Sequence, residues 1–329
     1  MSASQFTIYS SNDPGAPVLS GTVGTLLTVL DACLVNGYGS KLPPSPAWTK
    51  PFVNAGNIGC YKQGAGSLAS LSVNDNAPGA GGAKEARFTG YDTLTSVSTG
   101  TFPVPTAALA SASGLPAVAA SLIRKSATAD AVARDWVVVA DSSTLYMFVL
   151  TGDVTGGNQS WVSWMYGDIY SLAGSTDPCR ICVQGRRVEN SGGVVDSLDV
   201  FSGYNARVLG MWLAKSAGGG YTATEAGKFG FNVTTGGTLK GNIPTPNSAN
   251  LSYFICPIWV NEFNTNMGVG PIRGRMRGFY HFCHAVTTVV DGQIIQGVGD
   301  MAGKTFMILR QTLTAGVFCI EISATVDTN

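Results

Sequence analysis

This sequence contains few charged residues. The chain has 329 residues, of which 20 are Lys or Arg and 20 are Asp or Glu, so its formal net charge is zero and only 12% of it is charged. Globular proteins average about 25%. Nucleic acid and anionic membranes both attract clustered positive charge, so we expect no direct contact with either. Disorder is excluded as well, because 45% of the residues are hydrophobic and the mean hydropathy is +0.18.

Histidine is also scarce, since His281 and His284 are the two that the chain contains. General acid–base catalysis uses histidine most often, and neither of these lies in a context that indicates a catalytic triad. No serine occupies a Gly-x-Ser-x-Gly motif. Acidic residues such as Asp141 and Asp168 are scattered singly, so a carboxylate pair for glycoside cleavage would have to converge in space. We therefore predict no catalytic residues, and an enzyme only if two carboxylates meet in a cleft.

Cysteine is present in an odd number, seven, which does not suit the even disulfide framework of a small secreted protein. We expect most of these thiols to be reduced and buried. An alternative is that Cys179 and Cys182 form disulfides between subunits. The same pair could hold zinc together with His281, Cys283 and His284, but this second group lacks a recognised ligand spacing. We therefore predict no metal site.

Residues 297–305 end like a phosphate-binding loop, in Gly303-Lys304-Thr305. That motif requires a glycine five residues before its Gly-Lys-Thr glycine, where this chain has Val298, and it requires a helix afterwards. Residues 306–309 have instead the composition of a strand. We therefore predict a turn that leads into a C-terminal strand, and no cofactor.

Glycine, by contrast, is abundant, with 42 residues that follow no repeat. Dispersed glycines between short apolar runs indicate many turns between strands, since glycine adopts positive φ without steric cost. We predict a mainly β fold, a sandwich or barrel-like body with one N-terminal amphipathic helix, and α+β as the fallback. The helix is expected at residues 22–36, with Ser20 or Thr22 as its N-cap and Gly37 as its stop.

Ten short segments have the composition of strands. The clearest hairpin joins residues 136–140 to 145–150, and we expect both of its faces to be buried, because both strands are apolar at consecutive positions. The full set comprises residues 58–62, 68–73, 86–91, 136–140, 144–150, 161–166, 206–213, 253–260, 304–310 and 316–322.

Three segments rich in Gly, Ser, Thr and Asn are expected to be long loops, at residues 74–82, 152–160 and 217–250. The last is long enough to be an inserted hairpin, a contact arm or a boundary between two β modules, and the sequence leaves these alternatives open. We divide the chain into a β-rich body of residues 1–216 that includes the helix, the inserted loop or arm of residues 217–250, and C-terminal strands in residues 251–329 that complete the same body.

One basic cluster stands out in this weakly charged chain, formed by Arg273, Arg275 and Arg277. Guanidinium groups suit carboxylates at interfaces, so we expect an acidic groove on a neighbouring subunit as their partner. Aromatic residues also anchor interfaces. These residue types give the predicted contact residues: Trp161, Trp164, Tyr166, Tyr221, Phe229, Arg273, Arg275 and Arg277.

The stretch of residues 26–41 ends in Gly37-Tyr38-Gly39-Ser40-Lys41 and is followed by Trp48-Thr49 and Tyr61-Lys62-Gln63-Gly64. This pattern resembles the N-terminal signature of a family of virion structural proteins of tailed bacteriophages. Residues 135–141, 145–146, 148 and 167–169 resemble the family's central segments, and residues 301–306 and 317–321 resemble its closing hairpin. Residues 217–250 depart from the family pattern.

The resemblance implies a place in the virion, at the neck or collar, on the tail or on the head surface, and carries no enzymatic signature. We expect a structural subunit in multiple copies, whose partners are copies of itself and other virion proteins. Residues 1–5 lack the parts of a secretory signal, so synthesis in the host cytoplasm is expected. The alternatives are a head decoration protein, a β-sandwich that binds a receptor or glycan through Trp161 and Trp164, and a depolymerase or peptidoglycan hydrolase.

Overall fold

The computed structural model describes residues 6–54, 57–76, 83–108, 121–155, 158–173, 180–184, 211–215, 224–229, 253, 255–262, 270–282, 289–290, 292–310 and 317–322. Within these ranges the chain is mostly β, with several antiparallel sheets and a short helical segment near the N-terminus. The predicted mainly β fold is confirmed. None of the helices in these ranges has the length and hydrophobicity that a membrane span requires.

The largest element is a sheet of 13 strands, in which most paired strands along the main path are close in sequence and two pairs join strands that are farther apart. The short strand β12 (Tyr170–Ser171) pairs with β17 beside the main path. Along that path the order is β1 (Thr7–Ser10), β9 (Asp135–Ala140), β10 (Thr144–Thr155), β11 (Asn158–Asp168), β13 (Ile181–Gln184), β14 (Met211–Leu213), β15 (Thr224–Phe229), β16 (Ile255–Glu262), β17 (Ile272–Phe282), β20 (Val317–Glu321), β19 (Thr305–Arg310) and β18 (Ile294–Gln296).

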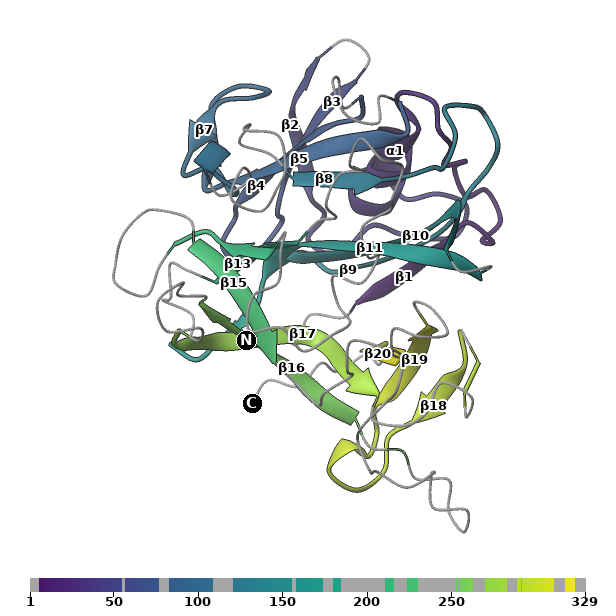
Figure 1. Ribbon diagram of the computed structural model, residues 1–329, viewed down its shortest axis with the longest axis vertical. Helices are drawn as coiled ribbons and strands as arrows, with labels where there is room; N and C mark the ends of the chain where they lie inside the picture. Colours follow the sequence, from purple (N-terminus) through teal and green to yellow (C-terminus); the bar gives the residue numbers. More distant parts are fainter. Residues whose placement is uncertain are drawn as a thin grey trace.

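A second sheet lies over the first strands of the large one, as Figure 1 shows, together with the helix α1 (Thr25–Leu30). The strands β16 to β20 lie on the opposite side of β9, β10 and β11, so the fold has three layers (Figure 1). The second sheet has the order β2 (Thr49–Asn54), β3 (Ile58–Lys62), β4 (Ser70–Asn74), β5 (Glu85–Tyr91) and β8 (Ser121–Arg124), and β6 (Thr93–Leu94) pairs with β7 (Gly100–Thr101) in a small hairpin.

The strands β9, β10 and β11 form a central layer with a hydrophobic core on each face. Along β9, Val138 belongs to the core shared with α1 and the second sheet, whereas Val139 belongs to the core shared with β17 and β20. In β10, Met147 and Phe148 repeat this alternation. Side chains of a strand alternate between its faces, so a layer that is buried on both sides requires consecutive apolar residues. The predicted hairpin with two buried faces is confirmed.

The N-terminal helix begins three residues later than predicted. Regular α-helix spans Thr25–Leu30 and continues as the π-helical segment η1 (Asp31–Asn36), and Gly37 ends it with φ at +77°. The hydroxyl of Thr25 donates to the carbonyl oxygens of Ser20 and Thr22, which bends the chain before the helix. The prediction of Ser20 or Thr22 as N-cap is wrong, because the N-cap is Gly24 and no side chain of the cap itself bonds the helix.

Two of the predicted loops contain strands. β10 and β11 continue into residues 152–160, where Val154 pairs with Gln159 and Thr155 with Asn158, so the predicted loop is wrong there. Backbone pairing sustains a polar hairpin whose composition resembles that of a loop. Residues 217–250 include β15, which pairs with β14 and β16, and the remainder of that segment lies outside the described ranges. The division of the chain into body, insertion and C-terminal strands stays a prediction.

The glycine-rich turn near the C-terminus has the expected structure. A 3₁₀ turn at Gly299–Met301 leads into β19, which pairs with β18 and β20. The residues after Lys304 therefore form a strand, as predicted, where a phosphate-binding loop would require a helix.

Candidate functional site

Trp164 and Tyr166, two of the predicted contact residues, lie inside the subunit. Both are 0% exposed on β11 and belong to the core shared with α1 and the second sheet. Trp164 stacks on Phe88 with the ring centroids 5.1 Å apart, and the Tyr166 hydroxyl donates to the Ser70 carbonyl oxygen at 2.7 Å. Their assignment to the surface is wrong, because β11 belongs to the layer that is covered on both faces. Trp164 is thereby excluded as an exposed platform for a glycan.

The arginine cluster finds acidic partners within its own chain. All three arginines lie on β17, where Arg277 Nη2 is 2.8 Å from Asp141 Oδ2 and Arg273 pairs with Glu262. Arg273 and Arg277 are only 6% and 9% exposed, and Arg275 between them is half-buried. The predicted acidic groove of a neighbouring subunit is therefore wrong for Arg273 and Arg277, since carboxylates of the same chain pair with them.

Cys182 is also inside the fold. It is a free thiol with 0% exposure in the core between the central layer and β17, and burial raises the pKa of this thiol well above its ordinary range. The prediction that it forms a disulfide between subunits is wrong, because the thiol is buried in the core of its own subunit. Cys179 and Tyr221 lie outside the described ranges, and so do the side chains of Trp161 and Phe229.

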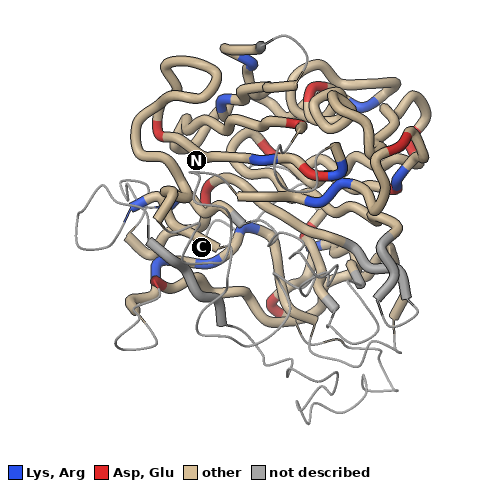
Figure 2. The backbone as a smooth tube through the Cα atoms, turned by 45° about the horizontal axis from the view of Figure 1, so that its top comes forward, with Lys and Arg blue, Asp and Glu red and all other residues tan. Residues whose placement is uncertain are grey.

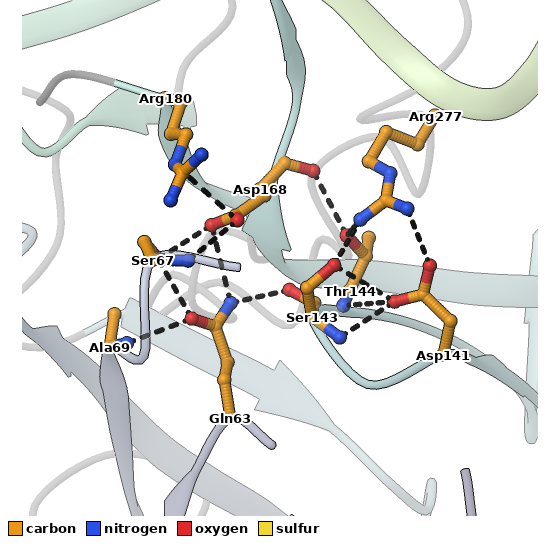
Figure 3. Close-up of polar contacts among 9 residues, drawn as sticks. All are labelled: Gln63, Ser67, Ala69, Asp141, Ser143, Thr144, Asp168, Arg180 and Arg277. Carbon is orange, nitrogen blue, oxygen red and sulfur yellow. Dashed lines mark hydrogen bonds and ion pairs between the residues drawn. The ribbon is translucent and has the colours of Figure 1, made fainter. Parts of the chain in front are cut away.

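The candidate functional site is a cluster of buried polar side chains that joins the three layers, which we call the junction. Figure 3 shows its members converging from the β3–β4 connection, from the turn between β9 and β10, from the end of β11 and from β17. The junction comprises Gln63, Ser67, Ala69, Asp141, Ser143, Thr144, Asp168, Arg180 and Arg277.

Asp168 is held by donors from the second sheet and from the chain before β13. The Ser67 backbone N–H donates to Oδ2 at 2.9 Å, the Ser67 hydroxyl donates to Oδ1 at 2.6 Å, and Arg180 Nε lies 3.5 Å from Oδ2. Burial raises the pKa of Asp168 above its ordinary value, although these donors and the charge of Arg180 act against the shift. Asp168 therefore ties the β3–β4 connection to the end of β11.

Asp141 and Arg277 form the other half of the junction. Asp141 Oδ1 accepts the backbone N–H groups of Ser143 and Thr144, each at 2.7 Å, and its other oxygen pairs with Arg277. Burial disfavours the charge on Arg277, but Asp141 and Tyr170 nearby outweigh it and leave the pKa of Arg277 above its ordinary value. The turn between β9 and β10 is thus fastened to β17 in the next layer.

Gln63 connects the two halves. Its side-chain nitrogen donates to the Ser143 carbonyl oxygen and lies 3.4 Å from Asp168 Oδ1, while its oxygen accepts the Ala69 N–H at 2.8 Å. The loop can come this close to Asp168 because residue 66 is glycine, with φ at +73°, and an added Cβ would collide with the Asp168 carboxylate. The junction is therefore one continuous hydrogen-bonded network.

The chemistry of the junction is limited by its burial. Asp141 is 1% exposed and Asp168 is 4% exposed, so both carboxylates lie inside the fold. Their oxygens are engaged by donors of the same chain, which suits a structural connection between layers. The enzymatic hypothesis required two carboxylates in an open cleft, and this pair gives it no support.

The zinc site considered for Cys179, Cys182, His281, Cys283 and His284 has no support among the residues described. No group of three or more His, Cys, Asp or Glu in these ranges is placed to hold an ion. Cys283 and His284 lie outside the ranges, and His281 is a buried residue of β17 that contacts Phe318 with the ring centroids 5.1 Å apart.

The sequence contained partial signals for the junction. Asp141 and Asp168 were among the acidic residues scattered singly along the sequence, and Gln63 belonged to one of the segments that carry the family resemblance. What joins them is spatial, since Gln63 and Asp168 are 105 residues apart.

Comparison with models of known protein families, with curated proteins and with solved structures finds no match for this chain.

Proposed function

We propose that this protein is a non-enzymatic structural subunit of a tailed bacteriophage particle, present in multiple copies at the neck, collar or tail. Its partners would be copies of itself and other virion proteins. Two lines support the proposal: the resemblance in residues 26–41 and in the segments that follow, and the way in which the folded chain uses its few charges. The second line is the observation on which we rely most.

The chain neutralises much of its charge internally. Among the residues described there are at least nine ion pairs, and each uses a different acid and a different base out of the 20 of each sign. Figure 2 shows blue and red segments interspersed along a mostly tan tube, without a block of one sign. Charges that are already paired within the subunit can be covered by another protein without the cost of leaving them unpaired in the contact.

Apolar side chains are exposed on several separate elements. Leu42 is 77% exposed, Val53 on β2 is 64% exposed, Leu172 after β12 is 62% exposed and Val290 before β18 is 65% exposed. A subunit that contacts neighbours through more than one face requires such residues at more than one place. Closed rings of identical subunits then gain stability from many weak contacts of this kind.

The test is whether the chain is a component of particles. We expect quantitative mass spectrometry of gradient-purified phage to find it at several copies per particle. Because few charges are available for the contacts, it should remain attached after a wash in about 1 M salt, where electrostatic attraction is screened within about 3 Å. Recovery of the chain only in the particle-free fraction of the lysate would refute the proposal.

A further inference from the structure

A second buried polar cluster lies on the other side of the central layer, under α1. It consists of Asp75, the residue after β4, and Lys125, the residue after β8, and both side chains are 0% exposed. Strand β5 separates β4 from β8 in the second sheet, and Lys125 spans it to reach Asp75. Val73, two residues before Asp75, belongs to the core that contains α1, so the pair lies at the end of a strand that packs into this core.

The contacts of this pair are few and specific. Lys125 Nζ contacts Asp75 Oδ1 and donates to the Thr22 carbonyl oxygen at 2.7 Å. The other carboxylate oxygen, Oδ2, accepts the backbone N–H of Leu26 at 3.0 Å, and the backbone N–H of Gly24 is a further donor to this carboxylate. Within the part of the chain that the structure describes, the three N–H bonds of the ammonium group thus have two acceptors.

Burial acts against the charged forms of both groups. Burial raises the pKa of Asp75 above its ordinary value, and burial lowers the pKa of Lys125 below its ordinary value. Each charge opposes the shift of its partner, but desolvation is the larger effect for both. Both shifts reduce the cost of passing a proton from the ammonium to the carboxylate, which would leave a nucleophilic amine against a carboxylic acid.

We propose that Lys125 and Asp75 condense into an amide that covalently links the ends of β8 and β4. The nitrogen lone pair of Lys125 forms a bond to Asp75 Cγ, and the bond from Cγ to Oδ1 breaks. Oδ1 leaves as water with two protons, one transferred from the ammonium group to the carboxylate beforehand and one lost by the attacking nitrogen. No oxidant, cofactor or second protein takes part.

The existing hydrogen bonds suit both the reaction and its product. Leu26 N–H already donates to Oδ2, the oxygen that carries negative charge in the tetrahedral intermediate, and it would stabilise that charge. In the amide, Oδ2 becomes the carbonyl oxygen and keeps the Leu26 donor, while the remaining N–H keeps Thr22 as its acceptor. The product therefore satisfies every polar atom and removes two charges from the core.

The fold raises the effective concentration of the two reacting groups, which is low when an amine and a carboxylic acid are free in solution. Two reactants held in contact inside a fold react as if at very high concentration. Exclusion of water from a site with 0% exposure also protects the amide from hydrolysis.

The intact mass of the full-length wild-type protein under denaturing conditions tests the proposal directly. We expect a mass lower by one water than the sequence requires. Trypsin should release residues 63–84 joined to residues 125–134, because a lysine in amide linkage is not cleaved. Lys125→Arg should restore the full mass, whereas Lys304→Arg, at the buried pair with Glu321, should keep the loss.

Because the decisive measurement uses the wild-type chain, it does not depend on the folding of a variant. A wild-type protein of full mass, with separate peptides for Asp75 and Lys125, overturns the proposal. A water loss that maps to any other residue overturns it equally.

Discussion

The junction and the Asp75–Lys125 pair are both buried and both contain opposite charges, but they satisfy those charges in different ways. In the junction, Asp141 receives two backbone N–H groups in addition to Arg277, and Asp168 receives two donors from Ser67. The pair under α1 has the backbone N–H groups of Leu26 and Gly24 as donors and the Thr22 carbonyl oxygen as acceptor, besides the two charged groups.

This difference separates two ways of holding layers together. Hydrogen bonds to a charge stabilise that charge in the interior, so the ion pair of Asp141 with Arg277 can hold the layers together permanently. A charge with few hydrogen bonds gains by losing its ionised form, and the adjacent amine and acid offer a covalent route to that end. Variants at the two clusters should therefore behave differently.

The largest effect is expected from Arg277→Met, which leaves Asp141 buried at 1% exposure without its cation. Removal of one partner of a buried ion pair costs about 3–5 kcal/mol. Denaturant unfolding should therefore show a loss of stability of this size. Arg275→Met, two residues along the same strand at a half-buried position, is the matched control and should lose clearly less. An equal loss of stability in both variants would show that the ion pair between Arg277 and Asp141 is not the cause of the loss.

Replacement of both members of the other cluster, Asp75→Leu with Lys125→Met, distinguishes an amide from an ion pair. A cross-link that closes a loop of about 50 residues contributes about 4 kcal/mol on the chain-entropy account, and the double variant should lose most of it. Apolar replacement of a simple buried ion pair is instead neutral or stabilising. A double variant as stable as the wild type in urea would therefore contradict an amide between Asp75 and Lys125 and indicate a simple buried ion pair.

Much of the β architecture could be predicted from local pattern. Strand β3 has the predicted bounds, and the apolar runs of β9 and β10 correctly indicated a layer buried on both faces. Strand β17 was missed, because Arg273, Arg275 and Arg277 among glycines have the composition of an exposed basic segment. Their burial depends on acids elsewhere in the chain, and composition does not report such pairing.

The candidate site was less predictable for the same reason. Trp164 and Tyr166 were assigned to contacts because aromatic residues anchor interfaces, yet the same chemistry anchors a core. The hydrogen bond between Arg277 and Ser143 spans 134 residues, and Asp75 caps the start of α1 at Leu26 from 49 residues away. Local signals locate strands and turns, whereas these contacts exist only after the layers have packed.

The smallest expected effect is a dependence of stability on pH. It tests whether burial or the hydrogen-bond donors have the larger influence on the pKa of Asp168. Its pKa is raised in the folded protein, so the folded state binds this proton more tightly than the unfolded state does. The carboxyl group therefore contributes stability that is fully present below its unfolded pKa of about 3.9 and is lost as the pH rises through the folded pKa. The free energy of unfolding of the wild type minus that of Asp168→Asn should fall as the pH rises from about 4 to neutrality.

Other groups, including Asp75, are common to both proteins and cancel in this difference, and Asp130→Asn at an exposed carboxylate is the control. A difference that grows toward neutral pH would mean that Ser67 and Arg180 outweigh burial, and the junction would then hold Asp168 as firmly as it holds Asp141.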